Sequence, residues 1–367
     1  MMDTCLRTAA PAAHRKKEDG IMKRERWNTG WKVWKDLDPF ELVFRVPDDA
    51  KEVDLPWDAM FHEKQSAQSV NGGACGHLDG GEYKYSRTLF AEEAWRGKPV
   101  FLQFEGVYRN ASVFVNGSKV GGCAYGYTDF CVEIGDYLRF GEENRVLVCV
   151  KCGTRNSRWY TGAGILRDVW LLTGEETFVP PYGLRMTTLS LSPEGALVEL
   201  EARIENRRLA SGTWRADAVL TDEDGKEAAA GSWLLRMKGR ESITLRRRIF
   251  GENARLWSAE HPHLYTAELT LTGEGGETNR ASAVFGIRTL SADSRHGLLV
   301  NGESVKLRGA CIHHDEGVLG GCAYADYEYW RIKKLKAAGF NAVRSAHNPA
   351  SQAVLSACDE LGMYVIA

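Results

Sequence analysis

The segment Val305-Lys-Leu-Arg-Gly-Ala-Cys-Ile312 marks the point where the chain changes from strands alone to alternating strands and helices. Its apolar composition and its length predict a strand. The elements predicted after it are a helix capped by Asp326, a strand at 340–343, a helix at 351–361 and a strand at 363–366. This β-α-β-α-β order within about 65 residues is typical of a parallel α/β fold.

The predicted α/β segment is too small to close on itself. Three strands cannot form a barrel, and no helix follows the last strand to cover its face of the sheet. The first helix is expected to present one apolar face, made of Tyr329, Ile332, Leu335 and Ala338. We therefore expect the chain to be cut off inside an α/β domain.

Residues 27–173 predict a β-sandwich. Runs of strand length occur at 100–105, 111–115 and 145–150, and Asn116-Gly117 is a tight-turn signal. Helical periodicity is almost absent here, and turns rich in glycine separate the strands.

A second β region follows the boundary signal Val179-Pro180-Pro181. About 110 residues with short strands and glycine-containing turns suit an immunoglobulin-like sandwich that lacks the Cys-Trp-Cys core. The strands predicted in the second β region are 196–205, 214–221, 243–249, 265–272 and 281–288.

At the other end of the chain, residues 1–21 have the composition of a disordered leader.

Composition excludes several classes of protein. The 367 residues are 44% hydrophobic and 26% charged, with a formal net charge of −2. Such a chain lacks the basic field that drives nucleic-acid binding, and no apolar run approaches the roughly 20 residues that span a bilayer. Nine cysteines are scattered along it without a recognisable signal peptide. We expect a cytoplasmic protein with reduced thiols and no nucleic-acid or membrane partner.

Two polar clusters follow two of the predicted parallel strands: His313-His-Asp-Glu316 and Arg344-Ser-Ala-His-Asn-Pro349. Ligands of parallel α/β folds bind beyond the carboxyl ends of the strands. Imidazole, guanidinium and carboxamide groups suit hydroxyl-rich or anionic ligands. The alternative is that these are loop residues satisfied by local hydrogen bonds. The candidate binding residues are His313, Arg344, His347 and Asn348.

Patterns typical of metal sites are weak. Cys149-Val-Lys-Cys152 is a single CxxC on a predicted strand, where positions three apart point to opposite faces. Adjacent residues of an extended segment diverge as well, so at most two side chains of 313–316 could share an ion. We assign no metal ligand.

Trp159 and Tyr160 lie beside Gly162 and Gly164 in the first β region. Aromatic faces pack on the C–H faces of sugars, so both residues are candidate sugar contacts. The alternative is core packing at a domain junction. The nearby Arg167-Asp168 is expected to form an ion pair at the edge of the sandwich.

Signatures of three large enzyme classes are missing, namely the Gly-x-Ser-x-Gly nucleophile turn, the phosphate-binding loop and the dinucleotide fingerprint. Glycoside hydrolysis needs only two carboxylates and no organic cofactor. No pair of carboxylates stands in a suitable context in this sequence, so we name no catalytic residue.

Six stretches, in family order, resemble glycoside hydrolase family two, the group of β-galactosidases, β-glucuronidases and β-mannosidases. The resemblance spans about residues 22–367. The six stretches are Phe104–Gly117, Asn156–Val169, Leu256–Tyr265, Phe285–Arg288, Leu307–His314 and Gly339–Pro349.

The resemblance implies a mostly β chain followed by α/β structure. It places a jelly-roll sugar-binding domain at 22–177, an immunoglobulin-like β-sandwich at 178–289 and the truncated start of a (β/α)8 TIM barrel at 290–367. In the family both catalytic glutamates lie on later barrel strands, so the 367-residue chain by itself is expected to be inactive.

The same resemblance implies a retaining β-galactosidase in the intact protein, which hydrolyses terminal β-D-galactosides. It implies that His313 and His347 bind the sugar in the catalytic subsite, with Asn348 and Arg344 flanking it. No cofactor is evident, although family members often bind Mg²⁺ or Na⁺ near this site. The alternatives are a β-glucuronidase or β-mannosidase relative and a non-catalytic carbohydrate-binding protein. The expected partner is a carbohydrate, with a homo-oligomer or a complementing chain as further options.

Overall fold

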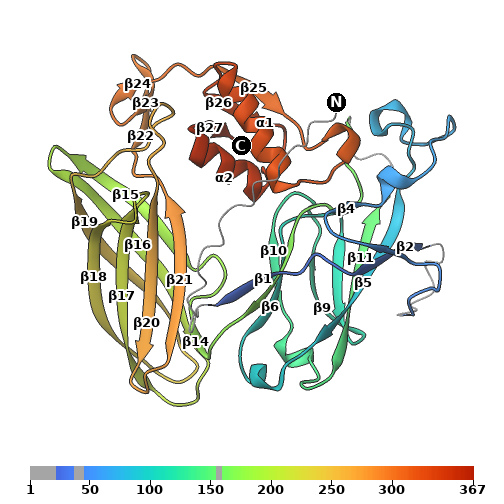
Figure 1. Cartoon of the computed structure of the whole chain (residues 1–367), viewed down its shortest axis with the longest axis horizontal. Helices are drawn as coiled ribbons and strands as arrows, with labels where there is room; N and C mark the ends of the chain where they lie inside the picture. The colour runs from blue at the N-terminus through green and yellow to red at the C-terminus, as the bar shows by residue number, and fades with distance from the viewer. Residues whose placement is uncertain (1–21, 37–44, 154–158) are drawn as a thin grey trace, which may run out of the picture.

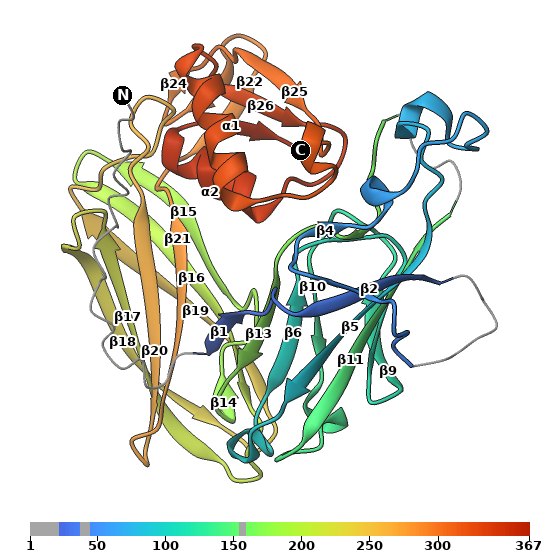
Figure 2. The ribbon, with the colours of Figure 1, turned by 45° about the vertical axis from the view of Figure 1, so that its right-hand side comes forward.

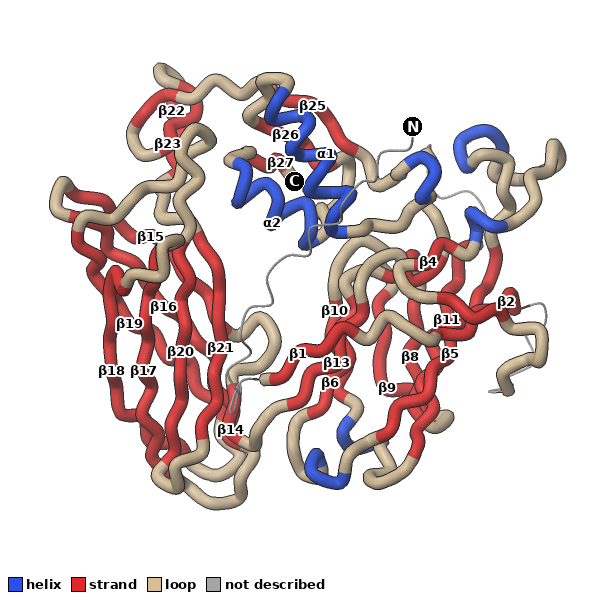
Figure 3. Tube along the Cα trace, viewed as in Figure 1, coloured by secondary structure: helices blue, strands red, loops and turns tan. Residues whose placement is uncertain are grey.

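A computed structural model of the chain describes residues 22–36, 45–153 and 159–367. The leader expected over residues 1–21 lies outside these ranges. Two β-sandwiches stand side by side, and an α/β segment sits at the same end of both (Figures 1 and 2). The α-helices of the described residues belong to this α/β segment, and the blue segments that Figure 3 shows in the first sandwich are short 3-10 turns. The predicted fold class, mostly β and then α/β, is confirmed.

The first sandwich is built from antiparallel strands. Its main sheets have the orders β1-β13-β6-β10 and β3-β2-β5-β11-β8-β9, and a small sheet has the order β4-β12-β7. In chain order the strands are β1 Lys23–Arg26, β2 Trp31–Asp36, β3 Lys51–Val53, β4 Trp57–Asp58, β5 Gly81–Phe90, β6 Val100–Phe104, β7 Val107–Tyr108, β8 Ala111–Val115, β9 Ser118–Cys123, β10 Phe130–Glu133, β11 Glu143–Cys152, β12 Gly164–Ile165 and β13 Val169–Thr173.

Alternating apolar positions form the core of this sandwich. In β8, for example, Ala111, Val113 and Val115 are buried while the residues between them are half-buried. Successive side chains of a strand point to opposite faces, so this period of two turns one face of each sheet inward. Trp31 and Phe104 are fully buried between the sheets.

The second sandwich has longer strands and the same alternation. One sheet has the order β14-β16-β15, with β19 paired to β16, and the other has the order β18-β17-β20-β21. Their inward faces enclose Trp214. The strands are β14 Thr177–Phe178, β15 Leu184–Ser192, β16 Gly195–Asn206, β17 Gly212–Asp222, β18 Glu227–Met237, β19 Ser242–Glu252, β20 Tyr265–Gly273 and β21 Thr278–Phe285.

The α/β segment follows a small antiparallel sheet of β22 Leu290–Asp293, β23 Gly297–Val300 and β24 Glu303–Ser304. Its parallel sheet has the order β25-β26-β27. Both helices pack on this sheet around Ile332, Val343 and Val354. The elements are β25 Gly309–Ile312, α1 Ala325–Ala337, β26 Ala342–Ser345, α2 Gln352–Leu361 and β27 Tyr364–Ile366.

Polar contacts tie the α/β segment to both sandwiches. Trp257 Nε1 of the second sandwich donates to Asp359 O at 2.8 Å, and Lys336 Nζ of α1 donates to Ala259 O at 2.6 Å. On the other side, Tyr324 Oη donates to Pro56 O at 3.0 Å. The described residues contain no helix long and apolar enough to cross a membrane.

Several predicted boundaries in the α/β segment are wrong. The first strand covers only Gly309–Ile312, and the second is displaced to Ala342–Ser345. The N-cap of α1 is Tyr324, which has extended dihedral angles. Asp326 instead lies within the first helical turn, where its charge complements the helix dipole.

The predicted inward face of α1 is also partly wrong. Ile332 is buried as expected, but Tyr329 is 37% exposed and Glu328 is buried in its place. Glu328 can be buried because it pairs with Arg331 one turn further along the helix. Helix α2, in contrast, starts as predicted: Ser351 Oγ accepts from the Val354 N–H at 3.2 Å.

Candidate functional site

The carboxyl ends of β25 and β26 bring the two polar clusters together. The strands are parallel and in register, with Ile312 opposite Ser345. The residues that follow them therefore emerge at one edge of the sheet. The rings of His313 and His347 lie there in an edge-to-face arrangement, with centroids 5.5 Å apart.

Trp159 of the first sandwich completes this group. Its ring centroid lies 5.4 Å from that of His313 and 5.3 Å from that of His347. Trp159 follows β11 along the chain, whereas both histidines belong to the α/β segment. We call Trp159, His313 and His347 the ring cluster. It places an aromatic face and two imidazoles, one of them exposed, at the junction of the two domains.

Arg344 and Asn348 flank the ring cluster. Arg344 Nη1 lies 2.7 Å from His347 Nδ1. A guanidinium can only donate, so His347 Nδ1 accepts and the ring proton lies on Nε2. Asn348 Oδ1 accepts from the Tyr125 hydroxyl at 2.5 Å, and Asn348 O accepts from Ser345 Oγ at 2.5 Å. The side chains of Arg344 and Asn348 are thus each fixed by a hydrogen bond, the first to His347 and the second from Tyr125.

The backbone carbonyl of His313 is hydrogen-bonded to Arg331, which forms a buried group with Glu316 and Glu328. Arg331 Nη1 donates to His313 O at 3.2 Å and to a Glu316 carboxylate oxygen at 2.7 Å. Arg331 Nη2 pairs with Glu328 at 2.7 Å. Glu316 and Glu328 are both buried. Burial, and then the neighbouring charge of Glu328, raise the pKa of Glu316 to about 8.

His314 points away from the ring cluster. Its ring packs on Tyr127 with centroids 4.7 Å apart, and its Nε2 lies 3.3 Å from Asn348 O. Burial, followed by the positive charge of Arg167, lowers the pKa of His314 to about 4. His314 is therefore neutral at pH 7, and its ring packs between the α/β segment and Tyr127 of the first sandwich.

Tyr160 lies outside the ring cluster. Its hydroxyl donates to Asp58 Oδ2 at 2.7 Å, and its ring meets the edge of Phe61 at a centroid distance of 6.2 Å. Burial and the Asp58 carboxylate raise the pKa of this phenol. Of the six candidate residues, three form the ring cluster and two flank it, whereas Tyr160 contacts Asp58 and Phe61 instead.

The expected ion pair between Arg167 and Asp168 is wrong. Arg167 is 6% exposed, and its guanidinium donates to Tyr127 O at 2.9 Å and to Pro349 O at 3.2 Å. Asp168 pairs instead with Arg26 at 3.2 Å. Neighbouring residues of extended chain point in opposite directions, so the two side chains separate.

Sequence reasoning also missed Asp58, Tyr125 and the group of Glu316, Glu328 and Arg331. Asp58 and Tyr125 lie far along the chain from Gly321 and Asn348, their hydrogen-bond partners in the α/β segment. Local spacing carries no signal of such contacts. A signal for the buried charges did exist in the Glu328 and Arg331 spacing, which puts opposite charges one helical turn apart.

The residues described here do not fit a metal ion. No group of three His, Cys, Asp or Glu side chains is arranged to hold one. In the cluster 313–316, His314 packs on Tyr127 while Glu316 pairs with Arg331. Cys152 is buried and its thiol faces Gly162 O, whereas Cys149 is only half-buried.

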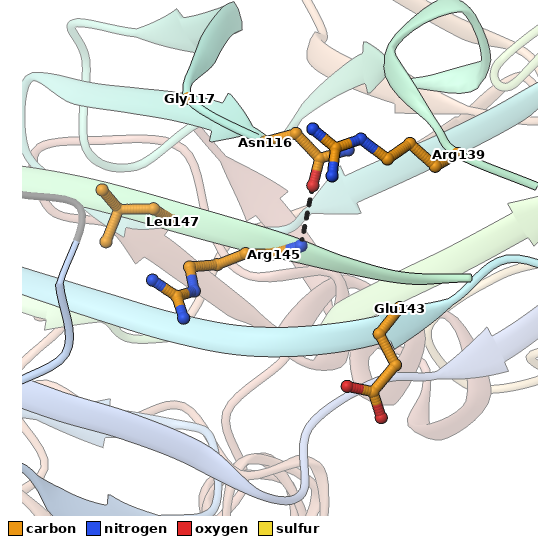
Figure 4. A pocket seen from close by; sticks show the side chains of 6 residues that line it. All are labelled: Asn116, Gly117, Arg139, Glu143, Arg145 and Leu147. Carbon is orange, nitrogen blue, oxygen red and sulfur yellow. Dashed lines mark hydrogen bonds between the residues drawn. The ribbon is translucent and has the colours of Figure 1, made fainter.

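A separate hollow lies at the other end of the first sandwich (Figure 4). It lies around Glu143, where β11 begins, whereas Trp159 follows the end of β11. Asn116 Oδ1 accepts from the Arg145 N–H at 3.1 Å in its wall. Half of its lining residues are charged, namely Arg139, Glu143 and Arg145, and none of the lining residues belongs to the ring cluster.

Three family models match most of the chain. Residues 73–175 match the sugar-binding domain of glycosyl hydrolases family 2, residues 184–288 match the glycosyl hydrolases family 2 model, and residues 293–367 match the TIM barrel domain of that family.

The similar proteins include relatives named as β-galactosidases and relatives named as β-glucuronidases. A β-galactosidase of Bacteroides ovatus is 31% identical over 319 residues, which are 87% of this chain and 38% of the relative. A β-glucuronidase of Bacteroides fragilis is 28% identical over 364 residues, 95% of this chain and 49% of the relative. The chain thus spans less than half the length of these relatives.

Solved structures agree. A family 2 glycosyl hydrolase from Bacteroides cellulosilyticus superposes with a TM-score of 0.89 and 32% identity, over 93% of this chain and 45% of that one. A β-glucuronidase from Bacteroides uniformis gives a TM-score of 0.84 at 24% identity, over 94% of this chain and 42% of that one, which supports the fold. With its two sandwiches and the opening strands of a TIM barrel, the chain belongs to glycosyl hydrolase family 2.

Proposed function

We propose that the intact protein is a retaining β-galactosidase and that this chain supplies one wall of its sugar pocket. The observation that carries the proposal is the ring cluster, in which Trp159 of the first sandwich meets His313 and His347 of the α/β segment. An indole face packs on the C–H face of a pyranose, while imidazoles exchange hydrogen bonds with its hydroxyl groups. Arg344 and Asn348 add a donor and an amide at the edge.

The chemical step needs two carboxylates about 5–5.5 Å apart, one as nucleophile and one as acid and base. Glu316 and Glu328 do not suit these roles, because both are buried and both pair with Arg331. We therefore propose that the catalytic pair belongs to further barrel strands of a longer protein, and that the 367-residue chain alone has no activity. Retaining hydrolysis requires no organic cofactor.

A β-glucuronidase is the second candidate function. Relatives with that name cover most of this chain, and Arg344 offers an exposed guanidinium beside His347. A guanidinium pairs well with a carboxylate such as that of a glucuronide. The galactoside remains the first choice because the β-galactosidase relative of Bacteroides ovatus is 31% identical to this chain.

Turnover by a protein with a complete barrel tests the choice of substrate. We expect hydrolysis of 4-nitrophenyl β-D-galactoside to exceed that of the matching glucuronide at least tenfold in kcat/KM. The reverse ratio would establish the glucuronidase. Sugar binding without turnover of either substrate would favour a non-catalytic carbohydrate-binding protein.

Binding to the 367-residue chain tests the sugar wall directly. Chemical shifts of ¹³Cε1-labelled histidines are followed while methyl β-D-galactoside is added. We expect the His313 and His347 signals to move, and His313→Ala to weaken the apparent affinity about tenfold. His261→Ala is the matched control, because His261 is exposed on the second sandwich. Signals that stay unmoved at saturating sugar would refute the assignment.

A further inference from the structure

Asp58 is a buried carboxylate at the junction between the first sandwich and the α/β segment. It stands at the end of β4 and is 2% exposed. Its Oδ1 accepts from the Ala163 N–H at 3.0 Å and the Phe61 N–H at 3.3 Å. Its Oδ2 accepts from the Tyr160 hydroxyl at 2.7 Å and from the Gly321 N–H at 2.8 Å. Of these four donors, the Gly321 N–H comes from the α/β segment, 263 positions away.

Glycines allow the backbone to come this close to the carboxylate. A Cβ atom added at Gly162 or at Gly320 would lie 2.7 Å from Asp58 Oδ2, and one added at Gly321 would lie 3.4 Å from it. Side chains at 162 and 320 would therefore push the carboxylate away. Gly320 also has a φ of +63°, a conformation that favours glycine. The absence of side chains at Gly162, Gly320 and Gly321 therefore leaves the space that the Asp58 carboxylate occupies.

The loop that reaches Asp58 is the loop that begins with His313. Its first residue packs on Trp159, and its end, Gly321, is held by Asp58. The Glu316 N–H donates to Gly320 O at 2.7 Å, which joins the two halves of the loop. A shift at Gly321 therefore reaches His313 through a short, internally hydrogen-bonded turn.

We propose that Asp58 is a positioning residue for the sugar site: by holding Gly321 it sets the place of His313 against Trp159. The first sandwich thus determines the geometry of a barrel loop in addition to contributing Trp159. This inference rests on the proposed function, since that function gives His313 its role. A purely structural Asp58 would stabilise the first sandwich and leave the environment of His313 unchanged.

The first test replaces the carboxylate. Asp58→Asn keeps the shape but has one accepting oxygen and one donating NH₂ group, so it cannot accept from all four donors. In one orientation its NH₂ group faces the N–H groups of Ala163 and Phe61, and in the other it faces the Tyr160 hydroxyl and the Gly321 N–H, so the carboxylate contacts are broken in both. Asp54→Asn is the matched control, because the exposed Asp54 accepts from the Gly30 N–H at 2.9 Å within the same sandwich. Both variants are compared with the unaltered 367-residue chain, without sugar.

Two measurements are made on these proteins. Hydrogen exchange followed by mass spectrometry is expected to show at least tenfold faster exchange in peptides covering 317–323 of Asp58→Asn, with peptides from the second sandwich unchanged. The ¹³Cε1 signal of His313 is expected to move, whereas those of His261 and His296, both on other parts of the chain, stay in place. Asp54→Asn is expected to change neither reading.

The second test works from the loop side and does not depend on a folded Asp58 variant. Gly320→Ala forces a Cβ into Asp58 Oδ2, whereas Gly317→Ala meets nothing within 4 Å. Both glycines have a φ near +60°, so each variant places an alanine at a positive φ, and Gly320 also has a ψ of −130°. We expect only Gly320→Ala to move the His313 signal.

Equal His313 shifts in Gly320→Ala and Gly317→Ala, or an unmoved His313 signal in a folded Asp58→Asn, would overturn the proposal. None of these readings requires sugar or turnover. Failure of the sugar-binding assay would therefore count against the proposed function alone, and failure of the paired variants would count against the role of Asp58 alone.

Discussion

The hydroxyl of Tyr125 donates a 2.5 Å hydrogen bond to Asn348 Oδ1, which joins residues 223 positions apart in the chain. Tyr125 belongs to the loop between β9 and β10 of the first sandwich, and Asn348 follows β26 of the α/β segment. The bond leaves the Asn348 NH₂ group as the end of this side chain that can face a ligand. A residue of the sandwich thereby determines how a barrel residue presents its amide.

Tyr125→Phe is expected to weaken sugar binding by about fivefold, since a hydrogen bond of this kind contributes about 1 kcal/mol. The amide of Asn348 would then be free to rotate. Titration of the labelled histidines with methyl β-D-galactoside measures the change. Tyr137→Phe is the control, because Tyr137 is exposed and lies beside the remote hollow near Asn116. Equal affinities of the two variants would contradict the role of Tyr125.

Arg167→Lys is expected to lower the free energy of unfolding by about 2 kcal/mol although the charge is kept. The guanidinium reaches Tyr127 O and Pro349 O together, and a single ammonium group on a shorter stem cannot replace that fork. Urea denaturation measures the loss. Arg145→Lys serves for comparison because Arg145 is exposed. A loss below about 0.5 kcal/mol for Arg167→Lys would show that the fork is dispensable.

His314 is expected to make the protein lose stability in acid. Its pKa falls from 6.5 to about 4 on folding, so between these values the unfolded state binds a proton that the folded state does not. Stability should therefore fall as pH drops from about 6.5 to about 4, by up to about 1.4 kcal/mol per pH unit. His314→Phe keeps a ring against Tyr127 and should flatten this part of the curve, as measured by urea midpoints at each pH. A curve identical to that of the unaltered chain would exclude His314 as the cause.

Glu316 is expected to act in the opposite direction. Its pKa rises from 4.5 to about 8 on folding, so the folded state keeps a proton that the unfolded state has released. Stability from this group is complete below about pH 4.5 and is lost as pH rises towards 8. Glu316→Gln cannot ionise, so the stability of this variant should increase relative to that of the unaltered chain as the pH rises through this interval. Thermal unfolding at several pH values measures the gap, and a gap independent of pH would contradict the assignment.

The last residues of the α/β segment are expected to exchange amide protons fast. Strand β27 pairs with β26 on one side, and Ile366 is 45% exposed. Apolar groups without partners contribute little to local stability. Hydrogen exchange of residues 352–367 in a monomer measures this, with β16 of the second sandwich as an internal reference. Protection equal to that of β16 would contradict the prediction.

Much of the architecture follows from local pattern. The period-two alternation of β8 and β16 identifies half-buried strands, and Ser351 with Gly362 marks both ends of α2. The carboxyl ends of two parallel strands must lie at one edge, so His313 and His347 could be expected to meet. Boundaries were less predictable: Tyr324 caps α1 in place of Asp326 because a cap is defined by backbone dihedral angles, which side-chain preference only biases.

The sequence by itself determined the order of strands and helices and the placing of both histidine clusters after parallel strands, because these depend on spacings within one element or between neighbouring ones. Only the tertiary structure decided that Trp159 faces those histidines, that Tyr160 turns to Asp58 and that Arg167 turns to Pro349. Each of these contacts joins residues about 100 or more positions apart. The contacts of Trp159 and Arg167 depend on how two separately folded cores pack together, and that of Tyr160 depends on how distant segments of the first sandwich meet. No local spacing in the sequence encodes either kind of packing.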